Sequence, residues 1–146
     1  NHEKIFFILT TNDYMMLPRP VTRRMEMKFF VDLPTAQERT EIAAKKLAKY
    51  SPAAVNLASD VSALTEEYTG AEIEDLVRSA ARLTKRNITL DAIKQAAKDI
   101  KPIARVRADE ITRLRNWGRA NLRIANTATE TISASKSKRA LEKINE

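Results

Sequence analysis

The sequence contains no cysteine, a single histidine at His2 and only two glycines in 146 residues. Without cysteine, a disulfide scaffold, a thiolate zinc site and a cysteine nucleophile are excluded. A lone histidine also excludes a metal site built from paired histidines of this chain. So few glycines favour helices over a β-rich fold with many tight turns. No apolar run reaches the roughly 18 residues of a membrane span, and no signal-peptide pattern occurs. We therefore expect a cytoplasmic protein without a membrane partner.

The net charge of +7 is unevenly distributed along the chain. Residues 1–102 hold 16 Lys and Arg against 14 Asp and Glu, whereas residues 103–146 hold 10 against 5. Most of the excess positive charge therefore falls in the last third. This pattern is typical of a solvated helix face, and it also suits an anionic partner such as nucleic acid or an acidic protein surface.

Two short apolar segments near the N-terminus have the composition of buried strands. They are K-I-F-F-I-L-T at 4–10 and K-F-F-V-D-L at 28–33, rich in aromatic and β-branched residues. The intervening segment contains two prolines and no clear period, which predicts mostly loop. A polar cluster from Thr10 to Asp13 follows the first segment. In open α/β sheets, ligands bind beyond the carboxyl ends of the strands, so this cluster either faces a site or forms a simple turn.

The remainder of the sequence predicts helices. Capping boxes T-A-Q-E at 35–38 and T-G-A-E at 69–72 open helices that extend to about Tyr50 and about Arg86. A loop is expected at 51–59, followed by a short helix that Asp60 caps, and a further helix that begins after Thr89 and stops before Pro102. The 3.6-residue period predicts a common core that includes Tyr68, Ile73, Leu76, Val77, Ile93 and Ala97.

The last third predicts a basic amphipathic helix over 107–125, with Leu114, Leu122 and Ala125 facing inward. Arg115, Arg119 and Arg123 recur every four residues and therefore lie along one flank. These arginines are the candidate contacts for nucleic acid, although the single nearby aromatic residue, Trp117, is a weak signal for base stacking. A Thr- and Ser-rich linker at 126–137 and a short helix at 138–146 are expected to follow.

These elements predict an α/β fragment with two strands of a parallel sheet, followed by an all-α unit and a helical extension. The expected divisions are 1–34, 35–102 and 103–146. Two parallel strands cannot cover their own edges, and the first strand appears within the first few residues. We therefore expect the chain to be the later part of an α/β domain whose first part lies elsewhere.

Three blocks of the sequence, taken together, resemble the C-terminal half of an AAA+ ATPase module. They are F-F-I-L-T-T-N-D at 6–13, F-F-V-D-L-P-T-A-Q-E-R at 29–39 and Y-T-G-A-E-I-E-D-L-V at 68–77, and the resemblance covers residues 4 to about 100. It implies a parallel AAA-type sheet, a helical lid and ATP with Mg²⁺ as cofactor. It also implies a ring-shaped homo-oligomer, a hexamer in many members, that remodels a macromolecular substrate.

The resemblance also implies roles for individual residues. Asn12 matches the first sensor, which orients the water that attacks the γ-phosphate. Arg23 and Arg24 precede the F-F-V-D-L-P block, where the family places its arginine finger, which stabilises the phosphoryl group bound in a neighbouring subunit. Gly70 and Ala71 match the place where the helical lid meets the adenosine. The residues by themselves also allow a solvated arginine pair and an ordinary first helical turn.

One departure from the family is decisive for activity. No G-x-x-x-x-G-K-[ST] loop occurs, and no apolar run ends in Asp-Glu, so a phosphate-binding loop and a Mg²⁺-binding carboxylate are missing from this sequence. We therefore expect this chain alone to be inactive and most cofactor ligands to lie in an N-terminal half. The alternative is a non-catalytic helical module that binds nucleic acid or an acidic partner through its basic helix.

Overall fold

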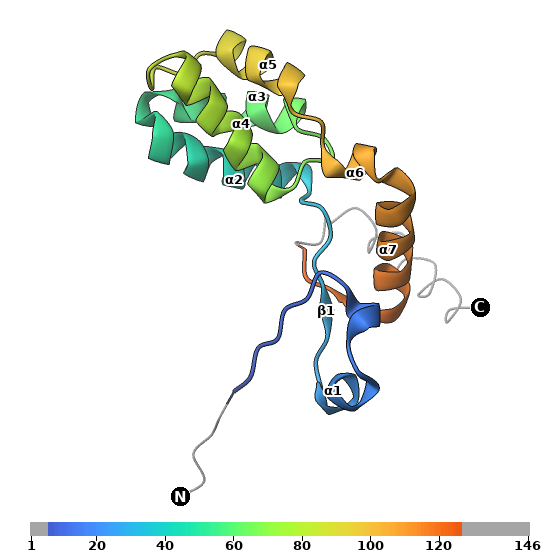
Figure 1. Cartoon of the computed structure of the whole chain (residues 1–146). Coiled ribbons are helices and arrows are strands. Elements are labelled where there is room, and N and C mark those ends of the chain that lie inside the picture. Colours follow the sequence, from blue (N-terminus) through green and yellow to red (C-terminus); the bar gives the residue numbers. More distant parts are fainter. Residues whose placement is uncertain (1–5, 127–146) are drawn as a thin grey trace, which may run out of the picture.

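The computed structural model describes residues 6–126. Its largest unit is a helical bundle, shown at the top of Figure 1, made of α2 (Ala36–Tyr50), the 3₁₀ helix η2 (Pro52–Leu57), α3 (Ala58–Leu64), α4 (Gly70–Leu83) and α5 (Leu90–Asp99). Both predicted capping boxes form: Thr35 and Glu38 cap α2, and Thr69 and Glu72 cap α4. Each box satisfies backbone N–H groups that a helix leaves without partners at its start.

The bundle core agrees with the helical period. Tyr68, Ile73, Leu76, Val77 and Ile93 are buried in one apolar cluster, and Ala97 is partly buried against it. Three local predictions are wrong. The expected loop at 51–59 is mostly a 3₁₀ helix, α3 begins at Ala58 rather than after Asp60, and α4 ends at Leu83. Lys85 and Arg86 have positive φ angles of 49° and 73°, which ends the helix before the predicted Arg86.

The sheet differs most from the prediction. Of the segment 28–33, only β1 (Phe29–Phe30) is a strand, and its parallel neighbour is β2 (Arg123–Ile124), which the sequence analysis assigned to a helix. The predicted helix over 107–125 is instead α6 (Ile103–Val106) and α7 (Ala108–Asn121). Leu122 is already extended and ends α7, so Leu122 and Ala125 leave the helix.

The predicted strand at 4–10 is absent from its described part, residues 6–10. Residues 6–10 have no regular structure, and Phe6, Phe7 and Ile8 are 76–79% exposed. A strand needs hydrogen bonds to a neighbouring strand, and none of the described residues pairs with this segment. The following segment is less irregular than expected, because it forms the 3₁₀ helix η1 (Tyr14–Met16) and α1 (Arg19–Arg24). The predictions for 127–146 and for residues 4 and 5 lie outside the described residues.

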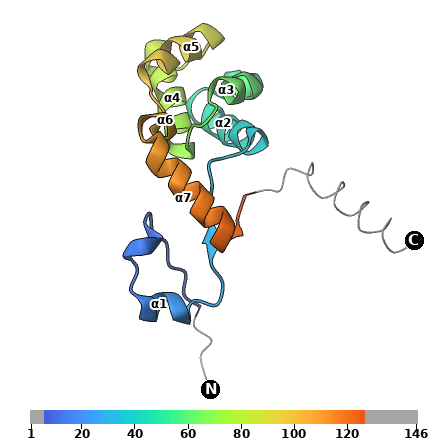
Figure 2. The ribbon, with the colours of Figure 1, turned by 90° about the vertical axis from the view of Figure 1, so that its right-hand side faces the viewer.

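Helix α7 connects the bundle to the N-terminal segment (Figure 2). Its first turn follows α6 beside the bundle, and its last turns lie against β1, where the Phe30 ring packs directly on Gly118. Trp117 of the same helix contacts Tyr14 of η1 with a ring-centroid distance of 4.8 Å. Among the helices of residues 6–126, none is long and apolar enough to cross a membrane.

Candidate functional site

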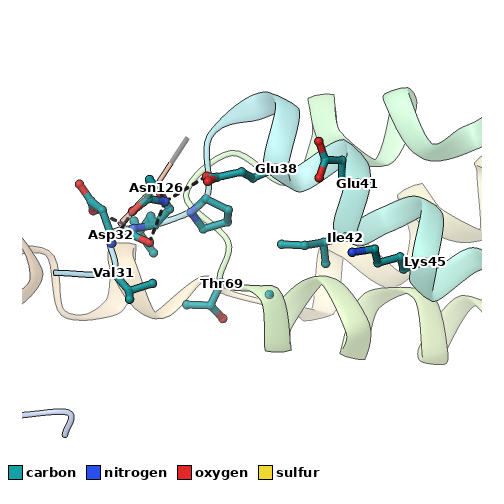
Figure 3. Close-up of a pocket in the computed structure, with 11 residues that line it drawn as sticks. Val31, Asp32, Glu38, Glu41, Ile42, Lys45, Thr69 and Asn126 are labelled. Atoms are coloured by element: carbon teal, nitrogen blue, oxygen red, sulfur yellow. Dashed lines mark hydrogen bonds between the residues drawn. The ribbon is translucent and has the colours of Figure 1, made fainter. Parts of the chain in front are cut away.

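An open pocket of about 520 Å³ lies where β1 leads into α2 (Figure 3). The connection after β1 and Asn126, which follows β2, form one wall, and the starts of α2 and α4 form the other. The lining residues are Val31, Asp32, Leu33, Pro34, Glu38, Glu41, Ile42, Lys45, Thr69, Gly70 and Asn126.

The first turn of α4 contributes a helix N-terminus to this pocket. The Thr69 hydroxyl accepts a hydrogen bond from the Glu72 N–H at 3.3 Å, and the Glu72 carboxylate accepts one from the Thr69 N–H at 2.7 Å. Gly70 follows as the first helical residue, and a Cβ at this position would lie 3.6 Å from Ile42 Cδ1. A methyl group at this position would therefore be in ordinary van der Waals contact with Ile42, another residue of the pocket lining. The predicted contact Gly70 lines the pocket, whereas the neighbouring Ala71 is exposed and does not.

The pocket combines apolar walls with an acidic rim. Val31, Leu33, Pro34 and Ile42 supply the apolar surface. The charged lining residues are three carboxylates, of Asp32, Glu38 and Glu41, against one ammonium group, of Lys45. The Asp32 charge is offset by Arg115 and Arg119, and the lining offers a single ammonium group, so the pocket has no cluster of positive groups that would hold a polyphosphate. A flat, mostly neutral group such as a nucleobase with its ribose suits it better.

Asn126 binds the wall of the pocket at several points, and the sequence analysis missed it because it assigned this position to a linker. Its side-chain oxygen accepts a hydrogen bond from the Asp32 N–H at 2.7 Å. Its side-chain nitrogen donates to Glu38 Oε2 at 3.0 Å and to the Leu33 carbonyl at 3.3 Å. Asn126 therefore links the β1–α2 connection to the capping box of α2. No local pattern around Asn126 indicates these contacts.

The other predicted site residues lie away from this pocket. Asn12 is exposed between the extended N-terminal residues and η1. Arg23 and Arg24 are exposed in the last turn of α1. None of the three lines the pocket that contains Gly70. The roles of Asn12, Arg23, Arg24, Gly70 and Ala71 all stay predictions.

Two of the three basic residues predicted to form an anion-binding flank contact Asp32. Arg115 Nε donates to Asp32 Oδ1 at 2.6 Å, and Arg119 Nη2 lies 2.5 Å from Asp32 Oδ2. Arg123 lies in β2, and within residues 6–126 its side chain forms no ion pair. The partner of the arginine flank therefore includes an acidic residue of the same chain, 83 and 87 positions away.

Curated proteins from three algae resemble this chain over most of its length. An uncharacterized AAA domain-containing protein, ycf46, of Trieres chinensis is 28% identical over 137 residues, which covers 88% of this chain and 28% of that protein. Proteins with the same description from Gracilaria tenuistipitata var. liui and Pyropia yezoensis are each 30% identical over 120 residues, covering 77% of this chain and 24% of theirs. The chain thus spans about a quarter of the length of these relatives. No family model and no solved structure matches it. The similarities support the relationship to AAA+ ATPases that the three sequence blocks indicate.

Proposed function

We propose that this chain is the C-terminal portion of an AAA+ ATPase that couples ATP binding and hydrolysis, in a ring-shaped oligomer, to the remodelling of a macromolecular substrate. The observation that carries the proposal is the pocket between the β1–α2 connection and the first turn of α4, with Gly70 at its edge. The relatives described as AAA domain-containing proteins support nucleotide use by such a site.

The pocket is proposed to hold the adenosine and not the phosphates. Its apolar walls suit a purine ring, and its lining has only one ammonium group, of Lys45, to face the negative charge of a triphosphate. The phosphates are therefore directed out of this pocket, toward a phosphate-binding loop that this sequence does not contain. The described residues also contain no cluster of three or more metal-ligating side chains. We propose that Mg²⁺, which neutralises charge on the phosphates, is held mainly by residues outside this chain.

The exposed side chains of the N-terminal segment fit roles outside the adenosine pocket. Arg23 and Arg24 project from a short helix and are free to reach another subunit, as a finger acting across an interface requires. Asn12 precedes η1 and is equally accessible. The alternative, a nucleic-acid-binding module, is less favoured, because Arg115 and Arg119 are already paired with Asp32.

The test is to fill the pocket in the intact protein, in which, under this proposal, this chain is joined to a phosphate-binding loop. Gly70→Leu projects a side chain into the space beside Ile42, and because Gly70 has no positive φ angle, the backbone tolerates it. The affinity for a fluorescent ADP analogue should fall by about tenfold or more, the equivalent of losing about 1.4 kcal/mol of binding free energy.

The matched control is Ala36→Leu. Ala36 is the first residue of α2 and, like Gly70, directly follows the capping Thr; it is exposed and does not line the pocket. It should leave the affinity within about twofold of the unaltered protein. Equal nucleotide affinities of Gly70→Leu and Ala36→Leu, with both proteins folded by circular dichroism, would remove the assignment of this pocket.

A further inference from the structure

The Asp32 carboxylate is buried at the rim of the pocket in a way that the proposed function does not by itself explain. Its side chain is 6% exposed, although it lies in the connection between β1 and α2. Arg115 Nε donates to one carboxylate oxygen at 2.6 Å, and Arg119 Nε donates to the other at 2.8 Å. The Leu33 N–H donates to it at 2.7 Å. Each oxygen therefore has a donor from α7, in a charge-assisted arrangement that fixes direction as well as distance.

We propose that Asp32 is a positioning residue: clasped by Arg115 and Arg119, it fixes the β1–α2 connection against α7 and so sets the shape of the nucleotide pocket. The consequence for nucleotide binding rests on the proposed function, whereas the contact itself does not. The three residues Asp32, Arg115 and Arg119 are called the clasp below.

The topology explains why a clasp is needed at this place. The chain leaves β1 through residues 31–35, builds the whole bundle, and returns through α6 and α7 to pair β2 with β1. The pairing of β2 with β1 and the packing of Phe30 on Gly118 already attach the end of α7 to β1, but neither contact reaches the connection at 31–35. The clasp and Asn126 hold this connection itself, from residues 83 to 94 positions later in the sequence. Figure 1 shows α7 running from the bundle down to β1 beside this connection.

The clasp acts directly on the pocket because its acceptor is part of the wall. Asp32, Leu33, Pro34 and Asn126 line one side, while the residues from α2 and α4 line the other. Any rotation of the bundle relative to β1 therefore changes the distance between the two walls. Burial raises the pKa of Asp32, but the hydrogen bonds from Leu33, Arg115 and Arg119 lower the pKa more, so that it lies below its ordinary value. The carboxylate is thus held in its charged form, which the clasp requires.

The experiment measures the position of the bundle relative to β1 without any nucleotide. This sequence has no cysteine, so once any cysteine elsewhere in the intact protein is replaced, Met27→Cys beside β1 and Lys94→Cys on α5 give a unique pair of spin-label sites, both exposed. In the intact protein, pulsed electron paramagnetic resonance should give one narrow distance distribution. Asp32→Asn and the double variant Arg115→Ala/Arg119→Ala should broaden it and shift its maximum.

Two further variants distinguish the specific loss of the clasp from a general unfolding of the protein. Arg113→Ala removes an arginine of the same helix that, within residues 6–126, donates a hydrogen bond to the Asp109 carbonyl of α7 and not to Asp32, and it should leave the distribution unchanged. Arg115→Lys/Arg119→Lys keeps both positive charges and should restore part of the narrow distribution. None of these residues belongs to the apolar cluster of the bundle, so the circular dichroism melting curve of the bundle reports that every variant is folded.

The affinity for the ADP analogue tests separately whether the clasp affects nucleotide binding. If the variants populate the clasped arrangement only about a tenth of the time, the apparent affinity falls about tenfold. Unchanged distance distributions in both Asp32→Asn and Arg115→Ala/Arg119→Ala would overturn the clasp, whatever the nucleotide data show. Broadened distributions with an unaltered ADP affinity would overturn its positioning role. Failure of the unaltered protein to bind nucleotide would instead contradict the proposed function.

Discussion

Gly118 is the position where a single methyl group should have the most informative effect. It is buried in α7, and a Cβ built on it would lie 2.5, 2.6 and 2.8 Å from Cδ2, Cγ and Cε2 of the Phe30 ring. Real Cβ atoms essentially never approach other heavy atoms this closely. In Gly118→Ala, either the Phe30 ring or the helix must therefore move, and the contact between α7 and β1 must loosen.

Two opposing contributions determine the size of the effect. Alanine inside a helix is favoured over glycine by about 1 kcal/mol, which stabilises α7. Overpacking of a close contact costs about 1–3 kcal/mol, and Phe30 is only half-buried, so its ring has some room to turn away. We expect a net loss of about 0–2 kcal/mol in the free energy of unfolding where an ordinary helical glycine would show a gain of about 1 kcal/mol.

The assay uses Trp117, the only tryptophan, as a local probe. Trp117 is adjacent to Gly118 and contacts Tyr14, so its emission in a urea titration reports the α7 contacts rather than the bundle alone. The variant is measured in the unaltered background and with Phe30→Val, which removes the ring. In the second background Gly118→Ala should stabilise, and the double-mutant cycle should give a coupling of about 1–3 kcal/mol. Equal stabilisation of about 1 kcal/mol in both backgrounds would refute the packing of Phe30 on Gly118.

Two further predictions concern the bundle. Leu76→Ala should lower the free energy of unfolding by about 2–5 kcal/mol in a denaturant titration, because Leu76 is 0% exposed. The control Leu83→Ala, on the exposed side of α4, should lower it by less than about 1 kcal/mol. Similar losses in the two variants would mean that the predicted buried face of α4 is wrong. Hydrogen bonds from Lys46, Lys49 and Tyr50 of α2 lower the pKa of Glu74, on α4, to about 2. These hydrogen bonds therefore stabilise the bundle fully above about pH 4.5, and their contribution is lost as the pH falls toward 2. Glu74→Gln should weaken the pH dependence of the melting temperature in this window. An unchanged pH dependence in Glu74→Gln would contradict the assignment.

The bundle could be predicted because its signals are local. A capping box needs residues three positions apart, and an amphipathic helix needs a period that is visible within a few turns. Thr69, Glu72 and the buried face of α4 therefore appear in the structure as the sequence indicates. The same local pattern predicts that Gly70 lies at the start of a helix. Only the family resemblance predicts that Gly70 also lies at a binding site.

The contacts around Asp32 could not be predicted in this way. Arginines four residues apart show that a helix carries a charged flank, and they do not show which group faces it. The role of Arg115 and Arg119 in binding an anionic partner stays a prediction, and within the described residues both side chains pair with the Asp32 carboxylate. The sequence predicts a linker at Asn126 for a similar reason, since a polar composition says nothing about contacts 94 positions away.

The predicted strand at 4–10 shows where an argument from composition stops. Continuous apolar residues predict burial, but a strand also requires a neighbour whose N–H and C=O groups face it. β1 is paired with β2, and no described residue pairs with residues 6–10. Phe6, Phe7 and Ile8 consequently lie in solvent, together with Phe29 and Val31. Burial of one such side chain is worth about 1.5–3 kcal/mol, so burying all five would contribute an amount comparable to a whole stability margin of about 5–15 kcal/mol. The composition and the structure therefore agree on one point, that the surface which would cover these residues is not supplied by residues 6–126. An AAA+ module shared between this chain and a further segment, as the proposed function requires, would supply both the neighbouring strand and the phosphate-binding loop at the same place.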